Sequence, residues 1–321
     1  MKQPTLLYVG MCTGDNGMTK AFRKYTDYHE LNCGIFNINE LMLEKAREVK
    51  PDILFLQVQT PAVINPVIIE SIRHELNTVI FNFSGDVRDP LPTWYKELAP
   101  IIHSTLFTNM VDVETIKKAG YCSDFLEIGF DPEIYNPIGP VNFKAPIVFM
   151  GNNYHMFPLS EERVQTVDAL KQRFGDRFAY FGNGWNPTVE NFNHSQAEEA
   201  AVYRGAKIAI NLSHFDYDSY SSDRILRIMG TGALCVCRNF KNVERRFREG
   251  DLLLYDTIGQ LLIICDYFLQ NEHDRERRTI AESGSIFVHA HHTFEEFTIN
   301  ILKLYDNYKA KSDRIHTSSL W

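Results

Sequence analysis

Short runs of apolar residues alternate along the first part of the chain with longer segments whose apolar residues recur every three or four positions. The short runs are typical of buried strands, and the longer period is typical of amphipathic helices. Strands that alternate with helices form parallel sheets, so this pattern predicts an α/β domain. The predicted strands are 6–9, 53–56, 78–83 and 105–108, and the predicted helices are 41–49, 66–76, 94–98 and 113–119.

The alternation stops between residues 130 and 146, where four prolines and a glycine occur without a helical period, and then restarts. Such a stretch is typical of a linker between domains. We therefore predict a first domain at 1–130, a proline-rich hinge at 131–146 and a second α/β domain at 147–321, whose last helix could return to the first domain. The second set of predicted strands is 147–150, 178–181, 207–212, 233–237 and 252–255, and the helices are 160–174, 195–204, 258–269, 275–281 and 293–308.

The stretch from Tyr220 to Cys237 combines a helix start with two arginines. Ser222 and Asp223 are residue types that cap helices, and Arg224 and Arg227 share one face of the helix that follows. Gly232 belongs to a Gly-Thr-Gly break before the next strand. A helix start with hydroxyl groups and arginines favours a phosphate, although an ordinary helix–turn–strand unit with solvated arginines fits the same pattern.

Several other polar or glycine-bearing loops follow predicted strands. In open parallel sheets, ligands bind at the carboxyl ends of the strands, so these loops are predicted to converge on one cleft. The residues singled out are Gly14 and Gly17 after the first strand, Asp86 after 78–83, Gly151 and Asn152 after 147–150, and Gly182, Gly184 and Trp185 after 178–181.

Each candidate residue also has a simpler explanation. Arg224 and Arg227 suit a diphosphate because guanidinium groups bind phosphate oxygens in pairs, but both could be solvated. Trp185 could cover a nucleobase or a sugar, or it could anchor the core. Asp86 could be the general base that deprotonates an acceptor hydroxyl, or it could cap a turn. Arg163 could reach the Gly151 loop, but we expect it on the surface of its helix.

Composition narrows the class of protein. The 321 residues include 33 Lys and Arg against 41 Asp and Glu, a net charge of −8, which gives no overall attraction to nucleic acid or anionic membranes. The six cysteines are scattered, with no zinc or disulfide spacing. The sequence has no signal-peptide pattern and no membrane-length apolar run, so we expect a cytoplasmic protein. His289, His291 and His292 do not share one helix face, and no metal site is predicted.

The segment Ser222-Asp223-Arg224-Ile-Leu-Arg227-Ile-Met-Gly230-Thr-Gly232, together with Phe181-Gly-Asn-Gly-Trp185 and the segments after it, resembles the spore-maturation CgeB-like glycosyltransferases. The resemblance covers roughly residues 151–302. It implies a GT-B fold, with two Rossmann-like, doubly wound parallel-sheet domains facing a cleft. It also implies a nucleoside diphosphate sugar as co-substrate, held mainly by the second domain, a retaining reaction and no tightly bound metal or other cofactor.

One departure from the family pattern concerns Arg227, where related enzymes carry a glutamate that contacts the donor. Either the donor is seated differently, with Arg227 on the diphosphate, or donor chemistry has been lost. We therefore predict a hexosyl- or pentosyltransferase that acts on an unknown hydroxyl acceptor, a saccharide or a small molecule. The alternatives are a phage-type enzyme that modifies a hydroxymethylated DNA base, for which Arg245, Arg246 and Arg248 could form a basic patch, and a non-catalytic sugar-nucleotide-binding protein.

Overall fold

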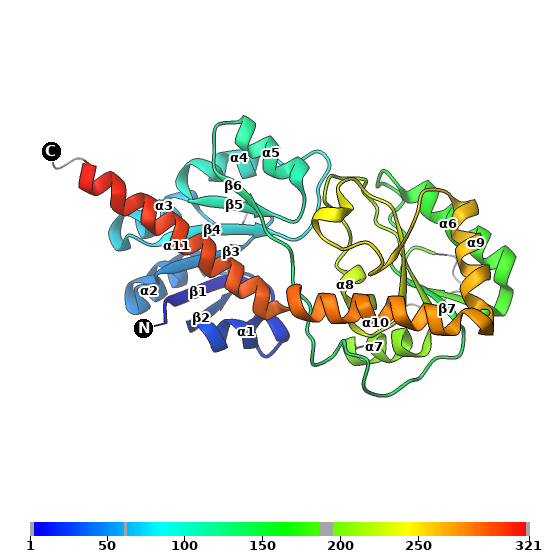
Figure 1. The fold of residues 1–321 in the computed structure, drawn as a ribbon. Coiled ribbons are helices and arrows are strands. Elements are labelled where there is room, and N and C mark those ends of the chain that lie inside the picture. The colour runs from blue at the N-terminus through cyan, green and yellow to red at the C-terminus, as the bar shows by residue number, and fades with distance from the viewer. Residues whose placement is uncertain (1–2, 61–62, 186–194, 319–321) are drawn as a thin grey trace. The chain divides into compact units, whose positions relative to one another are not determined.

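The computed structural model describes residues 3–60, 63–185 and 195–318, and the side chains up to residue 310. The chain forms two compact units (Figure 1). The first unit comprises residues 1–129 and 294–321, and the second comprises 130–293. The last helix thus belongs to the first unit, although most of the second half of the chain forms the second.

The first unit contains a parallel six-stranded sheet in the order β2-β1-β3-β4-β5-β6. From β1 the chain adds β2 on one side and then β3 to β6 on the other side, as in doubly wound sheets. Crossover helices therefore cover both faces of the sheet. The strands are β1 (Thr5–Gly10), β2 (Asp27–Asn32), β3 (Ile53–Gln57), β4 (Val79–Ser84), β5 (Ser104–Phe107) and β6 (Ser123–Phe125). The helices are α1 (Gly17–Tyr25), α2 (Ile38–Val49), α3 (Pro66–Leu76), α4 (Trp94–Leu98), α5 (Met110–Lys118) and α11 (Phe294–Ser318).

Side chains that alternate along these strands build two apolar layers. On one face, Phe55 and Phe83 pack against Phe297 of α11, with ring centroids 6.0 and 5.2 Å apart, and α1 contributes Phe22. Figure 1 shows α11 crossing this sheet. The opposite layer is filled from α2, α3, α4 and α5. The strands are buried on both faces, which explains their nearly continuous apolar runs.

The sequence pattern missed both edge strands of this sheet. β2 reads Asp-Tyr-His-Glu-Leu-Asn and is only partly buried, because an edge strand has one neighbour and a solvated flank. β6 has only three residues. Neither strand carries the apolar run that identified the central strands.

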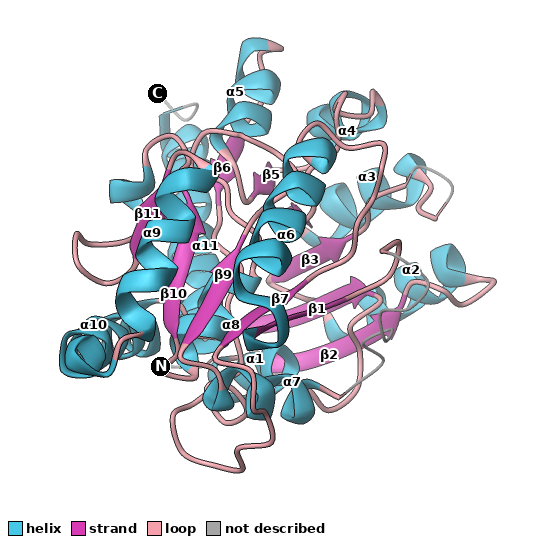
Figure 2. Ribbon diagram, turned by 90° about the vertical axis from the view of Figure 1, so that its right-hand side faces the viewer, coloured by secondary structure: helices cyan, strands magenta, loops and turns pink. Residues whose placement is uncertain are grey.

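The second unit contains a parallel five-stranded sheet in the order β11-β10-β9-β7-β8. Helices α6 and α9 lie side by side on one face (Figure 2), and α7, α8 and α10 pack against the other. The strands are β7 (Ile147–Met150), β8 (Phe178–Phe181), β9 (Ile208–Asn211), β10 (Leu234–Arg238) and β11 (Leu253–Tyr255). The helices are α6 (Ser160–Phe174), α7 (Gln196–Gly205), α8 (Arg224–Gly230), α9 (Ile258–Leu269) and α10 (Asp274–His291).

The proline-rich segment predicted as a hinge packs against α7 of the second unit. The Arg204 guanidinium donates to the carbonyl oxygens of Ile134 at 2.7 Å, Asn136 at 2.8 Å and Pro140 at 3.1 Å. One side chain thereby satisfies three carbonyl groups of a segment that forms no helix or strand of its own. This contact explains why the second unit begins at Phe130.

Candidate functional site

The loop after β7 and the turn after β8 are joined by backbone hydrogen bonds. Gly151 N–H donates to the Phe181 carbonyl at 2.8 Å, and Asn153 N–H donates to the Asn183 carbonyl at 2.8 Å. The Asn152 Oδ1 atom accepts from Asn183 N–H at 2.8 Å. Because β7 and β8 are neighbouring parallel strands, their following loops meet at the same edge of the sheet.

Two glycines permit this close approach. Gly182 and Gly184 have φ values of 135° and 79°, a region that side chains disfavour. A Cβ atom on Gly182 would lie 2.3 Å from the Gly151 oxygen, and one on Gly184 would lie 2.1 Å from the Asn153 oxygen. Both glycines are therefore required for packing between the two loops. Their predicted role in binding a nucleotide sugar stays a prediction.

Trp185 fixes the Gly151 loop from the other side. Its indole N–H donates to the Gly151 carbonyl at 2.7 Å. Its ring makes edge contacts with Phe149 and Tyr180, with centroids 6.1 and 5.4 Å apart. These contacts give Trp185 the role of an anchor for the loop, whereas the stacking role predicted for it remains untested.

Arg163 of α6 is buried, which makes the expectation of a surface arginine wrong. Its side chain is 1% exposed, and its Nη1 atom donates to the Leu212 carbonyl at 2.5 Å. The sequence did contain a signal, because Arg163 continues the buried stripe of Val167, Leu170 and Phe174 at helical spacing. An arginine within an apolar stripe is a candidate for a buried site rather than for the surface.

Arg163 and Arg224 converge on Gly151. Both guanidinium groups lie over the Phe149 ring, at 4.8 and 5.5 Å from its centroid. A Cβ atom on Gly151 would lie 2.3 Å from Arg163 Nη2 and 2.7 Å from Arg224 Nη2. Arg224 Nη1 also lies 3.4 Å from Asn211 Oδ1, and Asn211 is itself fully buried. The structure thus brings together Gly151 and Arg224, which were predicted as site residues, and Arg163, which was expected on the surface.

The two arginines form an incompletely satisfied positive site. Within the described part of the chain, Arg163 Nε and Nη2 are buried and have no hydrogen-bond partner. Burial and the neighbouring Arg224 charge lower the pKa of Arg163 well below its usual value. A bound anion would supply acceptors for these N–H groups and would offset the repulsion between the two cations. Phosphate oxygens are well suited to that role.

Arg227 has different partners from Arg224. Its Nη1 lies 3.3 Å from Glu199 Oε2, and its Nη2 forms an ion pair with Asp223. Glu199 also accepts from the Tyr135 hydroxyl at 2.7 Å. Arg227 is therefore engaged by two carboxylates, and its predicted contact with a diphosphate stays a prediction.

We expect Arg227→Met to reduce the free energy of unfolding by about 2 kcal/mol, because Glu199 would remain largely buried without its cation. Urea denaturation measures the change. The double variant Arg227→Met/Glu199→Gln should recover part of the loss, since it also removes the unpaired charge. An Arg227→Met protein of unchanged stability that no longer binds nucleotide would instead place Arg227 in the binding site.

The short helix predicted after Ser222 and Asp223 begins there. α8 has seven residues and starts at Arg224, with Asp223 at the N-cap position. The Asp223 side chain makes no capping hydrogen bond, and Ser222 Oγ accepts from the Arg224 N–H at 3.4 Å. The Asp223 carboxylate pairs with Arg227, and Ser222 N–H donates to Ser213 Oγ at 2.8 Å. Gly232 turns the chain from α8 into β10. The arginines rather than the helix terminus therefore dominate the site.

The predicted residues of the first unit lie on two of its loops. Gly17 begins α1, and Gly14 N–H faces the Glu30 carboxylate at 3.1 and 3.2 Å, so a carboxylate occupies the donor of this loop. The Asp86 side chain is 62% exposed and lies 3.4 Å from Arg88. The acceptor roles of these three residues stay predictions.

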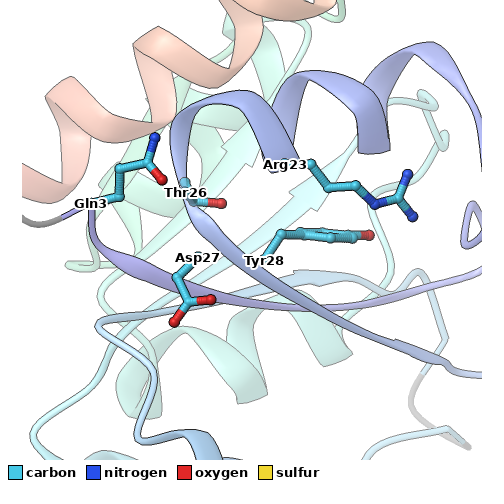
Figure 3. Close-up of a pocket in the computed structure, with 5 residues that line it drawn as sticks. All are labelled: Gln3, Arg23, Thr26, Asp27 and Tyr28. Carbon is cyan, nitrogen blue, oxygen red and sulfur yellow. The ribbon is translucent and has the colours of Figure 1, made fainter.

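An open hollow beside β2 is lined by Gln3, Arg23, Thr26, Asp27 and Tyr28 (Figure 3). The Arg23 guanidinium lies over the Tyr28 ring, 5.2 Å from its centroid, and Arg23 Nη2 donates to the Gly14 carbonyl at 3.1 Å. The contacts of Arg23 therefore connect this hollow with the Gly14 loop. Its lining residues were not among the predicted site residues.

The histidines of the C-terminal region do not converge. His289 Nε2 lies 3.0 Å from the Gly230 oxygen, and His292 Nε2 lies 3.2 Å from the Arg246 oxygen. Among the residues that the structure describes, no three His, Cys, Asp or Glu side chains are grouped to hold a metal ion. In the same ranges, no helix is both long enough and apolar enough to cross a bilayer.

Three partly buried histidines should make the protein sensitive to acid. Burial, aided by nearby arginines, lowers the pKa of His103 to about 4, of His214 to about 3 and of His292 to about 4. The unfolded chain therefore binds more protons below pH 6.5, so these groups reduce stability as the pH falls from 6.5 towards 4. Asp112, whose pKa burial raises to about 6, acts in the opposite direction.

We expect the Tm to fall by about 5 °C or more between pH 7.5 and pH 5, because three depressed pKa values outweigh one raised value. Thermal denaturation followed by circular dichroism measures this change. His103→Gln removes one of the titrating groups and should reduce the pH dependence. A Tm that is the same at both pH values would contradict the assignment of these histidines as neutral in the folded state.

The basic patch considered for DNA does not form as one exposed surface. Arg246 is 5% exposed and lies over the Phe240 and Phe247 rings, and Arg248 pairs with Asp251 at 2.9 Å. Arg245 is exposed. Packing thus explains Arg246 and a local ion pair explains Arg248, two of the three arginines that suggested a DNA acceptor.

Comparisons with known proteins agree with this two-unit architecture. A family model described as glycosyl transferase-like matches residues 163–303, a segment that contains both Arg163 and Arg224. A search of curated protein sequences finds no match. Among solved structures, HepE of Anabaena in complex with UDP and glucose has a TM-score of 0.66 at 10% identity, with 95% of this chain and all of that chain covered.

Two further solved structures have similar scores. A glycosyltransferase from Rickettsia africae has a TM-score of 0.64 at 14% identity, with 96% of this chain and 99% of that chain covered. Sucrose-phosphate synthase from Thermosynechococcus elongatus has a TM-score of 0.62 at 11% identity, with 96% and 100% covered. The predicted GT-B fold is therefore confirmed, and the match to the glycosyl transferase-like model covers most of the second unit and the start of α11.

Proposed function

We propose that the protein is a CgeB-like, metal-independent and retaining glycosyltransferase of the cytoplasm, which moves a hexosyl or pentosyl group from a nucleoside diphosphate sugar to a hydroxyl acceptor. The observation that carries this proposal is the pair of guanidinium groups at Gly151. Arg163 contributes buried N–H groups that have no partner among the residues the structure describes, and Arg224 lies beside it. The glycosyl transferase-like match over 163–303 and the solved complex of HepE with UDP and glucose support the same reading.

The proposed chemistry places the diphosphate of the donor against Arg163 and Arg224. The bond between the anomeric carbon and the diphosphate oxygen breaks, and its electron pair stays on that oxygen. Two fixed cations in a partly dry site stabilise this developing negative charge more than they stabilise the intact donor. The acceptor oxygen forms the new bond to the anomeric carbon on the face that the diphosphate leaves, which retains the configuration, and it loses its proton to a base.

Asp86 is the residue that we propose as this base. Its carboxylate follows β4 and is exposed, so an acceptor hydroxyl can approach it. Arg88 lies 3.4 Å from this carboxylate. Gly14 and Gly17 would contact the acceptor or the diphosphate from the same unit. The acceptor itself is proposed only as a saccharide or small molecule that bears a hydroxyl group.

Incubating the protein with UDP-, GDP-, ADP-, CDP- and TDP-linked sugars and measuring release of the nucleoside diphosphate tests the proposal. We expect release with one base above the others, and its loss in Arg224→Ala. An Arg224→Ala protein as active as the wild type would refute the site. Nucleotide binding without any release of the nucleoside diphosphate would favour the non-catalytic alternative. That alternative is suggested by Arg227, which stands where related enzymes carry a glutamate.

A further inference from the structure

The loop after β7 presents an aromatic side chain next to the two arginines. Tyr154 is 45% exposed, although its ring packs against Phe157 and His214 with centroids 5.4 and 5.5 Å apart. Phe157 packs in turn against the buried Phe215, at 4.9 Å. A large aromatic ring that is firmly supported and yet half exposed offers a surface on which a flat ligand can stack.

Polar contacts fix the orientation of the Tyr154 ring. Its hydroxyl accepts from Asn152 Nδ2 at 2.7 Å, beside Gly151. Its backbone N–H donates to His214 Nε2 at 3.4 Å. The hydroxyl end of the ring and the backbone that carries it are therefore both held before any ligand binds, which reduces the entropy lost on binding.

The His214 ring connects this surface with the arginine pair. His214 Nδ1 lies 3.4 Å from Arg163 Nη1, while its Nε2 faces the Tyr154 backbone. One imidazole ring thus separates Arg163 from the Tyr154 backbone. A ligand whose phosphates reach the arginines would carry its next chemical group towards Tyr154.

We propose that Tyr154 is the stacking platform for the nucleobase of the donor. This inference rests on the proposed function, because it takes the diphosphate to lie at Arg163 and Arg224. It assigns base recognition to the loop 151–157 and not to Trp185, whose ring packs against Phe149 and Tyr180 and whose N–H binds the Gly151 carbonyl. Stacking on an aromatic side chain tolerates any base, so Tyr154 contributes affinity rather than the choice of base.

Calorimetric titration of the whole protein with inorganic pyrophosphate and with UDP, GDP, ADP and CDP separates the two parts of this site. The wild type should bind at least one nucleoside diphosphate tighter than pyrophosphate, because only the nucleotide can stack. Tyr154→Ala should weaken that nucleotide about 10- to 50-fold and leave pyrophosphate within about twofold. Tyr154→Phe, which keeps the ring, should recover most of the nucleotide affinity.

Tyr267→Ala is the matched control in the same unit. Tyr267 is 38% exposed, stacks on His273 and donates its hydroxyl to Glu276, so it shares the features of Tyr154 but lies on α9. The Tyr267→Ala protein should bind pyrophosphate and the nucleotides with the same affinity as the wild type.

Four other outcomes would refute either the diphosphate site or the stacking role of Tyr154. Failure of the wild type to bind pyrophosphate or any nucleotide refutes the diphosphate site itself. Equal affinity of the wild type for pyrophosphate and every nucleotide leaves that site standing and refutes the platform. Equal loss of both ligands in Tyr154→Ala shows a merely structural role and also refutes the platform. UDP-glucose is titrated as a further ligand, and a Tyr154→Ala protein that loses UDP-glucose but keeps UDP shows that the ring contacts the sugar, which refutes the nucleobase assignment.

Discussion

Arg163→Met is expected to reduce the rate of nucleotide release from the preferred sugar donor at least 100-fold. The arginine supplies buried N–H groups that have no partner within the described residues and that point to Gly151. Removing one fixed donor from a site where negative charge develops typically lowers turnover 100- to 1,000-fold. Steady-state measurement of nucleoside diphosphate release gives the number directly.

The same substitution should not destabilise the fold, and this separates a binding role from a structural one. A buried cation whose pKa is strongly lowered by burial and by a second arginine disfavours the folded state. Methionine keeps an unbranched apolar side chain and carries no charge, so we expect the free energy of unfolding of Arg163→Met to equal or exceed that of the wild type. The lost hydrogen bond to the Leu212 carbonyl offsets part of this gain.

Arg173→Met is the control from the same helix. Arg173 is 58% exposed in its side chain and pairs with Asp266 at 2.8 Å on the surface, so its loss should change turnover less than twofold. If Arg163→Met unfolds the protein, the arginine is structural and the proposed site is wrong. If Arg163→Met is as active as the wild type, the diphosphate does not lie at Gly151.

The central strands of both sheets were predictable because burial on two faces produces apolar runs. β4, β7 and β8 lie within one residue of their predicted bounds, and α9 matches 258–269 fully. The edge strand β2 was missed because its residues are polar and only partly buried. Local sequence patterns thus identify strands that are buried on both faces. They miss edge strands that are held in the sheet mainly by backbone hydrogen bonds.

The candidate site was predictable only as a set of loops. The pattern placed Gly151, Gly182 and Arg224 at strand ends, and the parallel sheet brings the first two together. Which side chains pair depends on distances in the folded protein, and the spacing of residues in the sequence does not give these distances. Arg163 was expected at the surface although it is buried, and the carboxylate of Glu199 that engages Arg227 comes from another helix.

Gly151→Ala should weaken binding of the preferred nucleoside diphosphate about 50-fold while the fold is retained. The added methyl group would lie 2.3 Å from Arg163 Nη2 and 2.7 Å from Arg224 Nη2, so both guanidinium groups must move. Arg163 is 1% exposed and enclosed by Phe149 and Leu212, which leaves its guanidinium little space except the space that we assign to the diphosphate. A displacement of about 1 Å at a site that depends on exact positioning costs on the order of 100-fold, which is comparable with the loss expected here.

Two other glycines make this prediction specific. Gly259→Ala is the control, because a Cβ atom there would meet nothing closer than Thr257 Oγ1 at 3.8 Å, and we expect its affinity and stability to match the wild type. Gly182→Ala should instead lower stability, since its Cβ would lie 2.3 Å from the Gly151 oxygen and its φ of 135° is strained for alanine. Calorimetry and urea denaturation of the three variants distinguish these effects. If Gly151→Ala binds nucleotide as tightly as Gly259→Ala does, the space between the two arginines is not where the diphosphate binds.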